Sequence, residues 1–125
     1  MKVGDALPAL ERQIDMGDLV AYGAATWDWH PLHYDSKRSS EVGGEAPIVD
    51  GQMFGALLAK QIIDWLGPQA FITHLSLRYK SMVVAGSTVI CEGSVTRVDT
   101  DAIEVSQVVR NGNSVAVEAT ARVRL

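Results

Sequence analysis

The sequence predicts a single α+β domain spanning residues 1–125, in which an antiparallel sheet wraps around one long central helix and shorter helices occupy the first half. Three observations carry this prediction. Apolar and polar residues alternate from Phe71 to the end of the chain, one strongly apolar helical segment precedes that region, and turn-forming residues separate the alternating runs. With 125 residues, of which 47% are hydrophobic, the chain is long enough for one core.

The second half has the pattern of strands with one buried face. A period of two is typical of an antiparallel sheet that is wet on its other side. "AFITHLSLRY" comes first, with His74 expected to face solvent or a partner subunit, and Asn111-Gly112-Asn113 and "RVDTDA" supply hairpin turns. The residues expected to share the buried face are Val89, Cys91, Gly93 and Val95, then Ile103, Val105, Gln107 and Val109, then Val115, Val117, Ala119, Ala121 and Val123.

The central helix is predicted in "DGQMFGALLAKQIIDWLGP". Asp50 can cap it by accepting hydrogen bonds from the first free N–H groups, and Gly67-Pro68 ends it. Its middle, "MFGALLA", is apolar on every side, which predicts a buried helix. One helix cannot cover the whole inner face of the sheet, and a sheet edge would remain exposed, so we expect at least a dimer that pairs edge to edge.

Two shorter helices are predicted in the first half. "DMGDLVAYGAAT" begins at a capping Asp15, and "DSKRSSEVGG" begins at Asp35. Between them lies "WDWHPLHYD", a bend held by Pro31. The apolar stripe expected on the first of these helices consists of Met16, Leu19, Val20 and Ala24.

Charge and composition exclude several classes of protein. The net charge of −4 provides no basic face, so no nucleic-acid partner is expected. No apolar stretch is long enough for a bilayer, and "MKVGDALPALERQ" lacks the apolar region of a signal peptide, so we expect no membrane partner. Cys91 is the single cysteine and is expected to pack inertly in the core. A reducing, cytoplasmic location is predicted.

The bend carries the chemistry. Asp28 and His33 are five residues apart across a proline-containing bend, so their side chains can converge on one point. A carboxylate and an imidazole that share a water can take a proton from it and return one to a substrate. Taken singly, Asp28 could be a turn former and His33 a hydrogen-bonded structural residue. No metal site is expected, because the histidines lack a second acidic or thiol cluster at ligand spacing.

"YGAATWDWHPLHYDSKRSS" resembles the signature of MaoC-like (R)-specific enoyl-CoA hydratases, D-x-N-P-x-H, which falls on Asp28, Pro31 and His33. The resemblance extends over "PIVDGQMFGALLA" and the strands after it. It implies the hotdog fold, usually dimerised through sheet edges. It also implies a hydro-lyase that hydrates a trans-2-enoyl thioester or dehydrates a 3-hydroxyacyl thioester, carried by coenzyme A or acyl carrier protein. Coenzyme A would be the substrate carrier, and no other cofactor is implied.

The resemblance also implies a site. Asp28 and His33 would activate the water, and the backbone N–H of Gly51 would hold the thioester carbonyl, because a helix N-terminus stabilises the charge that develops there. His30 stands where the family usually has Asn and could still orient the dyad. Asp50 stands where the family often has His. A carboxylate near a developing enolate would raise the barrier, so Asp50 is expected to face away and cap the helix.

Further substrate-binding candidates are Tyr34, Met53 and Phe54, which could border an acyl pocket, although packing explains them equally well. Arg78 and Lys80 could meet the phosphates of coenzyme A, although a solvated strand face is the simpler interpretation.

Two alternative functions stay open. One is a hotdog thioesterase that uses a carboxylate at an end of the central helix, Asp50 or Asp64. The other is a hotdog subunit that needs a partner chain, homo- or hetero-oligomeric, to form an acyl-thioester-binding hydratase. "IIDWLGPQAFI" is similar to small hotdog subunits of steroid side-chain degradation.

Overall fold

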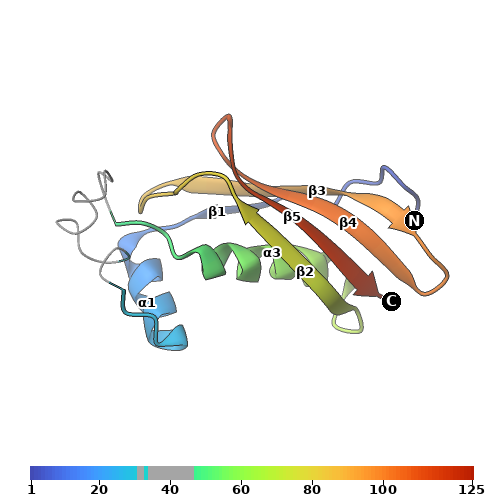
Figure 1. Cartoon of the computed structure of the whole chain (residues 1–125), viewed down its shortest axis with the longest axis horizontal. Helices are drawn as coiled ribbons and strands as arrows, with labels where there is room; N and C mark the ends of the chain where they lie inside the picture. Colours follow the sequence, from blue (N-terminus) through green and yellow to red (C-terminus); the bar gives the residue numbers. More distant parts are fainter. Residues whose placement is uncertain (31–32, 34–46) are drawn as a thin grey trace.

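The computed structural model describes residues 1–30, 33 and 47–125. The helix predicted in residues 35–44 therefore lies outside the described residues, as do Pro31 and Tyr34. The elements are β1 (Leu10–Gln13), α1 (Met16–Thr26), α3 (Gly51–Leu66), β2 (Phe71–Tyr79), β3 (Thr88–Val98), β4 (Ala102–Asn111) and β5 (Ser114–Arg124), shown in Figure 1. The predicted α+β class is confirmed.

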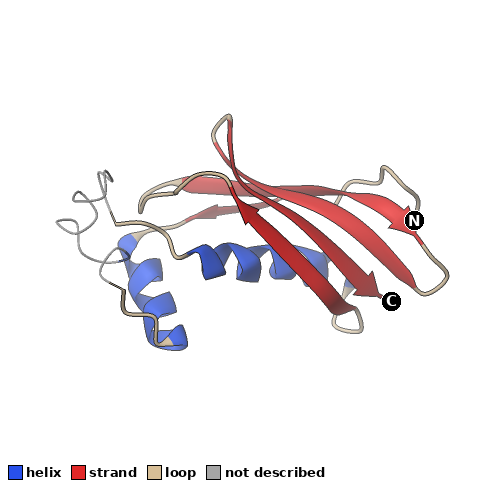
Figure 2. Ribbon diagram, viewed as in Figure 1, coloured by secondary structure: helices blue, strands red, loops and turns tan. Residues whose placement is uncertain are grey.

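The five strands form one sheet with the order β1-β3-β4-β5-β2, and all neighbouring strands are antiparallel. Figure 2 shows both helices on the same side of this sheet. The sequence did not predict β1, because "LERQ" has one apolar residue and no alternation. Its strand conformation comes from pairing with β3, from Leu10 opposite Cys91 to Gln13 opposite Thr88. The edges of the sheet are β1 and β2.

The buried face of the sheet is the predicted one. Cys91 packs in the core, and burial raises the pKa of its thiol to about 11, which keeps it protonated and unreactive. Gly93 and Val115 are half-buried. The buried members are Val89, Cys91 and Val95 of β3, Ile103, Val105, Gln107 and Val109 of β4, and Val117, Ala119, Ala121 and Val123 of β5.

The predicted turns and caps also form. Asp50 caps α3 through a hydrogen bond from the Gln52 N–H, and Gly67 ends it with φ 91°. Gly112 adopts φ 62° in the hairpin between β4 and β5, as the turn requires.

The central helix is not buried on all sides, so that prediction is wrong for this chain. Its side toward the sheet buries Met53, Phe54, Leu57, Leu58, Gln61 and Ile62. Its opposite side exposes Gln52, Ala56, Lys60 and Asp64. These four residues are spaced four apart and form one exposed stripe. Three of them are polar, and the fourth, Ala56, is small. The sheet therefore curves around one side of α3 and leaves the other side open (Figure 1).

The first helix starts as predicted but packs differently. Asp15 accepts a hydrogen bond from the Asp18 N–H and Asp18 returns one to the Asp15 N–H, so the two residues form a capping box. Of the predicted apolar stripe, Leu19 is buried, whereas Met16, Val20 and Ala24 are exposed. Only one side chain of the stripe reaches the core, because α1 lies beyond the N-terminal end of α3 and not alongside that helix (Figure 1). Within the described ranges, no helix combines the length and apolarity needed to cross a bilayer.

Two buried amides tie α3 to the sheet. Gln107 of β4 donates its Nε2 to the Leu58 carbonyl at 3.0 Å and to Gln61 Oε1 at 2.9 Å. Gln61 in turn donates its Nε2 to the carbonyls of Pro8 and Cys91, both at 3.0 Å. These directional bonds fix the rotation of the helix and its position along its axis, which apolar packing alone specifies less strongly.

Replacing Gln61 should therefore destabilise the fold. Gln61→Leu keeps the side-chain volume but removes the donor to the carbonyls of Pro8 and Cys91 and the acceptor of one Gln107 N–H. We expect the free energy of unfolding to fall by about 1–3 kcal/mol. Urea denaturation followed by circular dichroism measures this. The control is Lys60→Gln on the exposed stripe of the same helix, with an expected change below about 0.5 kcal/mol. Equal stability of Gln61→Leu and the wild type would contradict the structural role of the network.

Candidate active site

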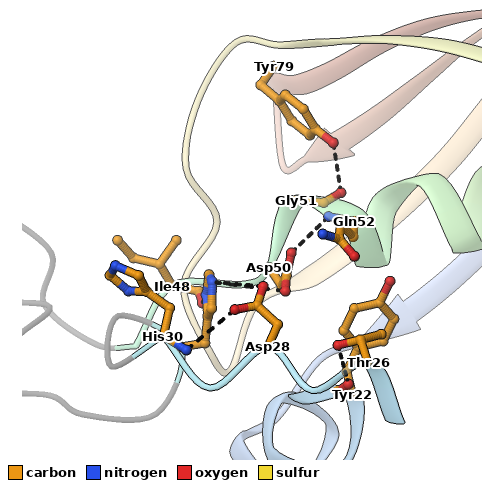
Figure 3. Close-up of polar contacts among 10 residues, drawn as sticks. Tyr22, Thr26, Asp28, His30, Ile48, Asp50, Gly51, Gln52 and Tyr79 are labelled. Carbon is orange, nitrogen blue, oxygen red and sulfur yellow. Dashed lines mark hydrogen bonds and ion pairs between the residues drawn. The ribbon is translucent and has the colours of Figure 1, made fainter. Parts of the chain in front are cut away.

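The chain turns back directly after α1, which places Asp28 beside the start of α3 (Figure 3). The turn begins at Trp27, which adopts a left-handed conformation with φ 57°. Gly23 of α1 makes room for the returning chain, since a Cβ there would lie 3.0 Å from the Asp28 carbonyl oxygen. The left-handed conformation of Trp27, which the sequence pattern did not predict, thus directs Asp28 toward the central helix.

Asp28 and His33 converge as the sequence predicts. His33 Nε2 lies 3.9 Å from Asp28 Oδ2, and the two side chains are 18% and 31% exposed. The other ring nitrogen, Nδ1, lies 2.6 Å from the Ile48 carbonyl oxygen. Because a carbonyl oxygen can only accept, Nδ1 carries the proton and Nε2 of the neutral ring has a free lone pair directed to the site. The second oxygen of Asp28, Oδ1, accepts the His30 N–H at 3.4 Å.

Asp50 does not face away from the site, so the expectation for this residue is half wrong. Its Oδ1 caps α3, accepting the Gln52 N–H at 3.0 Å. Its Oδ2, however, lies 4.0 Å from His33 Nε2 and has no hydrogen-bond donor among the described residues. The residue is 8% exposed. Because Oδ1 caps the helix, the direction of Oδ2 is fixed. Oδ2 points to the place where Asp28 and His33 converge.

The two carboxyl groups have opposite electrostatic environments. Hydrogen bonding with the Asp50 side chain, then the His30 N–H and the charge of His33, lower the pKa of Asp28 against an opposing effect of burial. Burial, followed by the same hydrogen bond with Asp28, raises the pKa of Asp50. A hydrogen bond between the two carboxyl groups would require one proton, shared between Asp28 and Asp50.

Tyr22 of α1 also faces this group and was not predicted. Burial raises the pKa of its phenol, and the negative charge of Asp50 adds to the effect. Its backbone carbonyl accepts the Thr26 hydroxyl at 2.8 Å, within the last turn of the helix (Figure 3).

Gly51 is the first residue of α3, so its N–H has no acceptor within the helix and lies at the positive end of the helix dipole. Its carbonyl accepts the Tyr79 hydroxyl at 3.0 Å, a contact between α3 and β2 that Figure 3 shows. A Cβ on Gly51 would lie 2.9 Å from Tyr79 Cε1. A side chain at this position would therefore have to displace the aromatic ring packed over the helix start. Tyr79 carries no local sequence signal for this role.

A cavity of about 380 Å³ opens beside His33 and Gly51. Phe54 borders this cavity, but Met53 does not: it lines a second cavity of about 360 Å³ between α1 and α3, together with Tyr22. The two adjacent residues proposed as substrate contacts therefore face different spaces. Lys80 lines the first cavity, whereas Arg78 lies with Glu118 and Thr120 in a different depression over β2, β4 and β5.

The remaining predicted residues are distributed as follows. His30 contributes a backbone N–H to Asp28, and its ring centroid lies 5.9 Å from that of His33. Tyr34 lies outside the described residues. Asp64 is exposed at the far end of α3 and pairs with Lys60 at 2.8 Å. It is fourteen residues from Asp50, roughly 21 Å along a helix, and takes no part in the site.

Asp28, His33 and Asp50 form the single cluster in the described part of the chain that could hold a metal ion, with ligand atoms within 4.8 Å of one another. The sequence argument against a metal relied on the lack of a second acidic group near the histidines. That reason is wrong, because Asp50 joins them. The absence of a metal cofactor stays a prediction.

The fold and site define a class that comparison with known proteins also finds. The family described as "MaoC like domain" matches residues 2–119, and the chain belongs to this family. The predicted family, hotdog fold and enzyme class are thereby confirmed: the chain is a hydro-lyase of the hydratase/dehydratase type.

Two relatives and one solved structure show the likeness in detail. The chain is 32% identical over 118 residues to the 3-oxo-4,17-pregnadiene-20-carboxyl-CoA hydratase beta subunit of Mycobacterium tuberculosis, covering 94% of this chain and 92% of that one. It is 28% identical over 120 residues to the (R)-specific enoyl-CoA hydratase of Aeromonas caviae, covering 93% and 90%. A chain in the crystal structure of the ChsH1–ChsH2 complex from Mycobacterium tuberculosis superposes with a TM-score of 0.94 at 31% identity, over 99% and 98% of the chains.

Gly51 and Gly55 offer a matched test of the helix start. In Gly51→Ala the new Cβ must displace the Tyr79 ring, and we expect a loss of about 1–3 kcal/mol in unfolding free energy. In Gly55→Ala the Cβ meets only Leu77, at an ordinary 3.7 Å, and we expect a gain of about 0.5–1 kcal/mol. Thermal and urea unfolding measure both. Adding Tyr79→Ala should remove most of the penalty of Gly51→Ala, and a penalty unchanged in that background would show that the ring is not its cause.

Proposed function

We propose that this protein hydrates a trans-2-enoyl thioester, or dehydrates the corresponding (R)-3-hydroxyacyl thioester, with Asp28 and His33 as the acid–base pair and the Gly51 N–H as the donor to the thioester carbonyl. The observation that carries the proposal is the convergence of the Asp28 carboxylate and the free His33 Nε2 at 3.9 Å, next to the first residue of α3. The (R) stereochemistry follows the relative that is named for it.

The dyad can hold one water in the required orientation. A water about 2.8 Å from each of Asp28 Oδ2 and His33 Nε2 directs one hydrogen to each acceptor and its lone pair outward. In the hydration direction the oxygen bonds to the β-carbon while the dyad takes one proton, and the dyad then delivers one proton to the α-carbon. Atoms balance, because one water is consumed and the dyad ends as it began.

The thioester carbonyl belongs at the start of α3. Attack at the β-carbon moves negative charge onto the carbonyl oxygen, and the Gly51 N–H offers a donor already oriented by the helix. The cavity beside His33 and Gly51 provides the space, with Phe54 as an apolar wall and Lys80 as a cation at its border. We therefore assign the acyl thioester of coenzyme A or acyl carrier protein to this cavity, with coenzyme A as carrier and no other cofactor.

The acyl group and the partner chain are proposed from the relatives. The relative named for a steroid-type acyl-CoA is a beta subunit, and the solved chain that superposes on this one with a TM-score of 0.94 belongs to a two-protein complex. The exposed edge strand β2, with Phe71 and Tyr79 each 56% exposed, is suited to pairing with a second hotdog chain. We propose an oligomer formed with itself or with such a chain, acting on fatty or steroid side-chain thioesters in the cytoplasm.

Removing either member of the dyad should abolish most of the activity. Asp28→Asn and His33→Ala are each expected to lower kcat by about 10²–10⁴-fold, because each removes a proton acceptor of the bound water. Loss of enoyl-CoA absorbance measures the rate over substrates from short straight chains to bulky ring systems. The control Asp64→Asn, exposed at the far end of α3, should retain wild-type kcat. Wild-type rates in both dyad variants would overturn the assignment.

Assaying the chain alone and with a second hotdog subunit separates the two assemblies. If the chain is a homo-oligomeric hydratase, light scattering gives a multiple of 13.5 kDa and the sample is active by itself. If it needs a partner, activity appears only when a second subunit is present. Release of free thiol from a saturated acyl-CoA without hydration would instead support the thioesterase alternative.

A further inference from the structure

We propose that Asp50 is a positioning residue that carries a proton and donates it in a hydrogen bond to Asp28, so that the dyad works beside a neutral carboxylic acid and not beside a second carboxylate. The effect on activity rests on the proposed function. The state of Asp50 does not, because it follows from the contacts of this side chain alone.

The burial of Asp50 is the first argument. The residue is 8% exposed, and Oδ1 receives the Gln52 N–H at 3.0 Å. Oδ2 is buried and has no hydrogen-bond partner among the described residues. An ionised oxygen buried in this way is costly, whereas a proton on Oδ2 removes the charge and supplies a hydrogen bond.

The surroundings of Asp50 give the second argument. Asp28, the nearest ionisable group on the segment after α1, is negative and favours a proton on Asp50. Tyr22 of α1 is a phenol whose pKa is raised by burial, so it adds no charge near pH 7. His33 is the single basic group among the described residues within 4.0 Å of Asp50, and its Nδ1 donates to the Ile48 carbonyl. The Gln52 N–H at the start of α3 and the charge of His33 favour the ionised form of Asp50, but burial and the neighbouring Asp28 outweigh them, so the pKa of Asp50 is raised.

Asp50 is also the better of the two carboxyls to hold the proton. Its side chain is 11% exposed, against 31% for Asp28, so ionisation costs more at Asp50. Asp28 receives the His30 N–H, and Asp28 would also receive the proton of Asp50 as a second donor. Two donors favour the ionised form of Asp28. The raised pKa of Asp50 and the lowered pKa of Asp28 agree with this division.

A neutral Asp50 removes the conflict raised by its position. It is adjacent to Gly51, whose N–H faces the developing enolate oxygen, and a full negative charge there would oppose catalysis. As the acid, Asp50 caps α3 with its carbonyl oxygen and orients Asp28 with its hydroxyl. The pH dependence follows in sign. The stability and activity that depend on this proton are present at low pH and are lost as pH rises through the raised pKa of Asp50.

Substituting Asp50 tests the role in activity. Asp50→Asn is isosteric with the acid and still offers an oxygen to Gln52 and an N–H to Asp28, whereas Asp50→Ala offers neither. We expect kcat to fall about 10-fold or more in Asp50→Ala. Asp50→Asn should recover most of that loss and should lose the alkaline decline in its pH–rate profile. Asp64→Asn, at the other end of α3, should keep the wild-type profile. An Asn variant as impaired as the Ala variant, with the decline intact, would overturn the proposal.

Carboxyl ¹³C NMR of the wild-type protein tests the proton directly and needs no activity. The Asp50 signal should titrate above the ordinary pKa of aspartate, and Asp28→Asn should lower that pKa by removing the neighbouring charge. An Asp50 already ionised at mildly acidic pH would refute the proposal, as would a signal that shifts when EDTA is added, since a cation would then occupy the site. If the Asp28 variants stay active while Asp50 titrates as expected, the proposed function fails and this inference stands.

Discussion

The packing of α3 against the concave side of the sheet is the constraint on which the site depends. Leu58 and Ile62 are fully buried there, and the paired amides of Gln61 and Gln107 set the rotation of the helix and its position along its axis. The N-terminus of α3 is thereby held at one place, next to Tyr79 of β2. Chemistry that uses the first N–H groups of a helix requires this accuracy, because a donor displaced by an ångström loses much of its effect.

The three side chains of the site share one principle of construction. Each uses one polar atom to hold its position and leaves the other facing the centre. His33 contacts the Ile48 carbonyl through Nδ1, Asp50 accepts the Gln52 N–H through Oδ1, and Asp28 accepts the His30 N–H through Oδ1. Among the atoms left over, His33 Nε2 lies 3.9 Å from Asp28 Oδ2 and 4.0 Å from Asp50 Oδ2. Backbone groups therefore preorganise the site, which explains how a short chain positions several ionisable groups.

The position of Asp50 shows how a departure from a family pattern is accommodated. A carboxyl at the start of the central helix is compatible with enolate chemistry when it is neutral, and its burial and its neighbour Asp28 both favour that form. The backbone N–H of His30 still reaches Asp28 where the family usually has Asn. Both departures thus lie in contact with Asp28, so they change the electrostatics around the dyad and leave its geometry in place.

The sequence by itself determined the elements whose signals are local. The period-two faces of β3, β4 and β5, the Asp15 and Asp50 caps and the Gly112 turn were all predictable, because each depends on residues a few positions apart. The convergence of Asp28 and His33 was predictable for the same reason. Only the tertiary structure decided the strand state of β1, the open stripe of α3, the direction of the second Asp50 oxygen and the contact of Tyr79 with Gly51. These depend on neighbours that are distant in sequence, such as Gly51 and Tyr79, which are 28 positions apart, and no local pattern encodes which side chains such packing brings together.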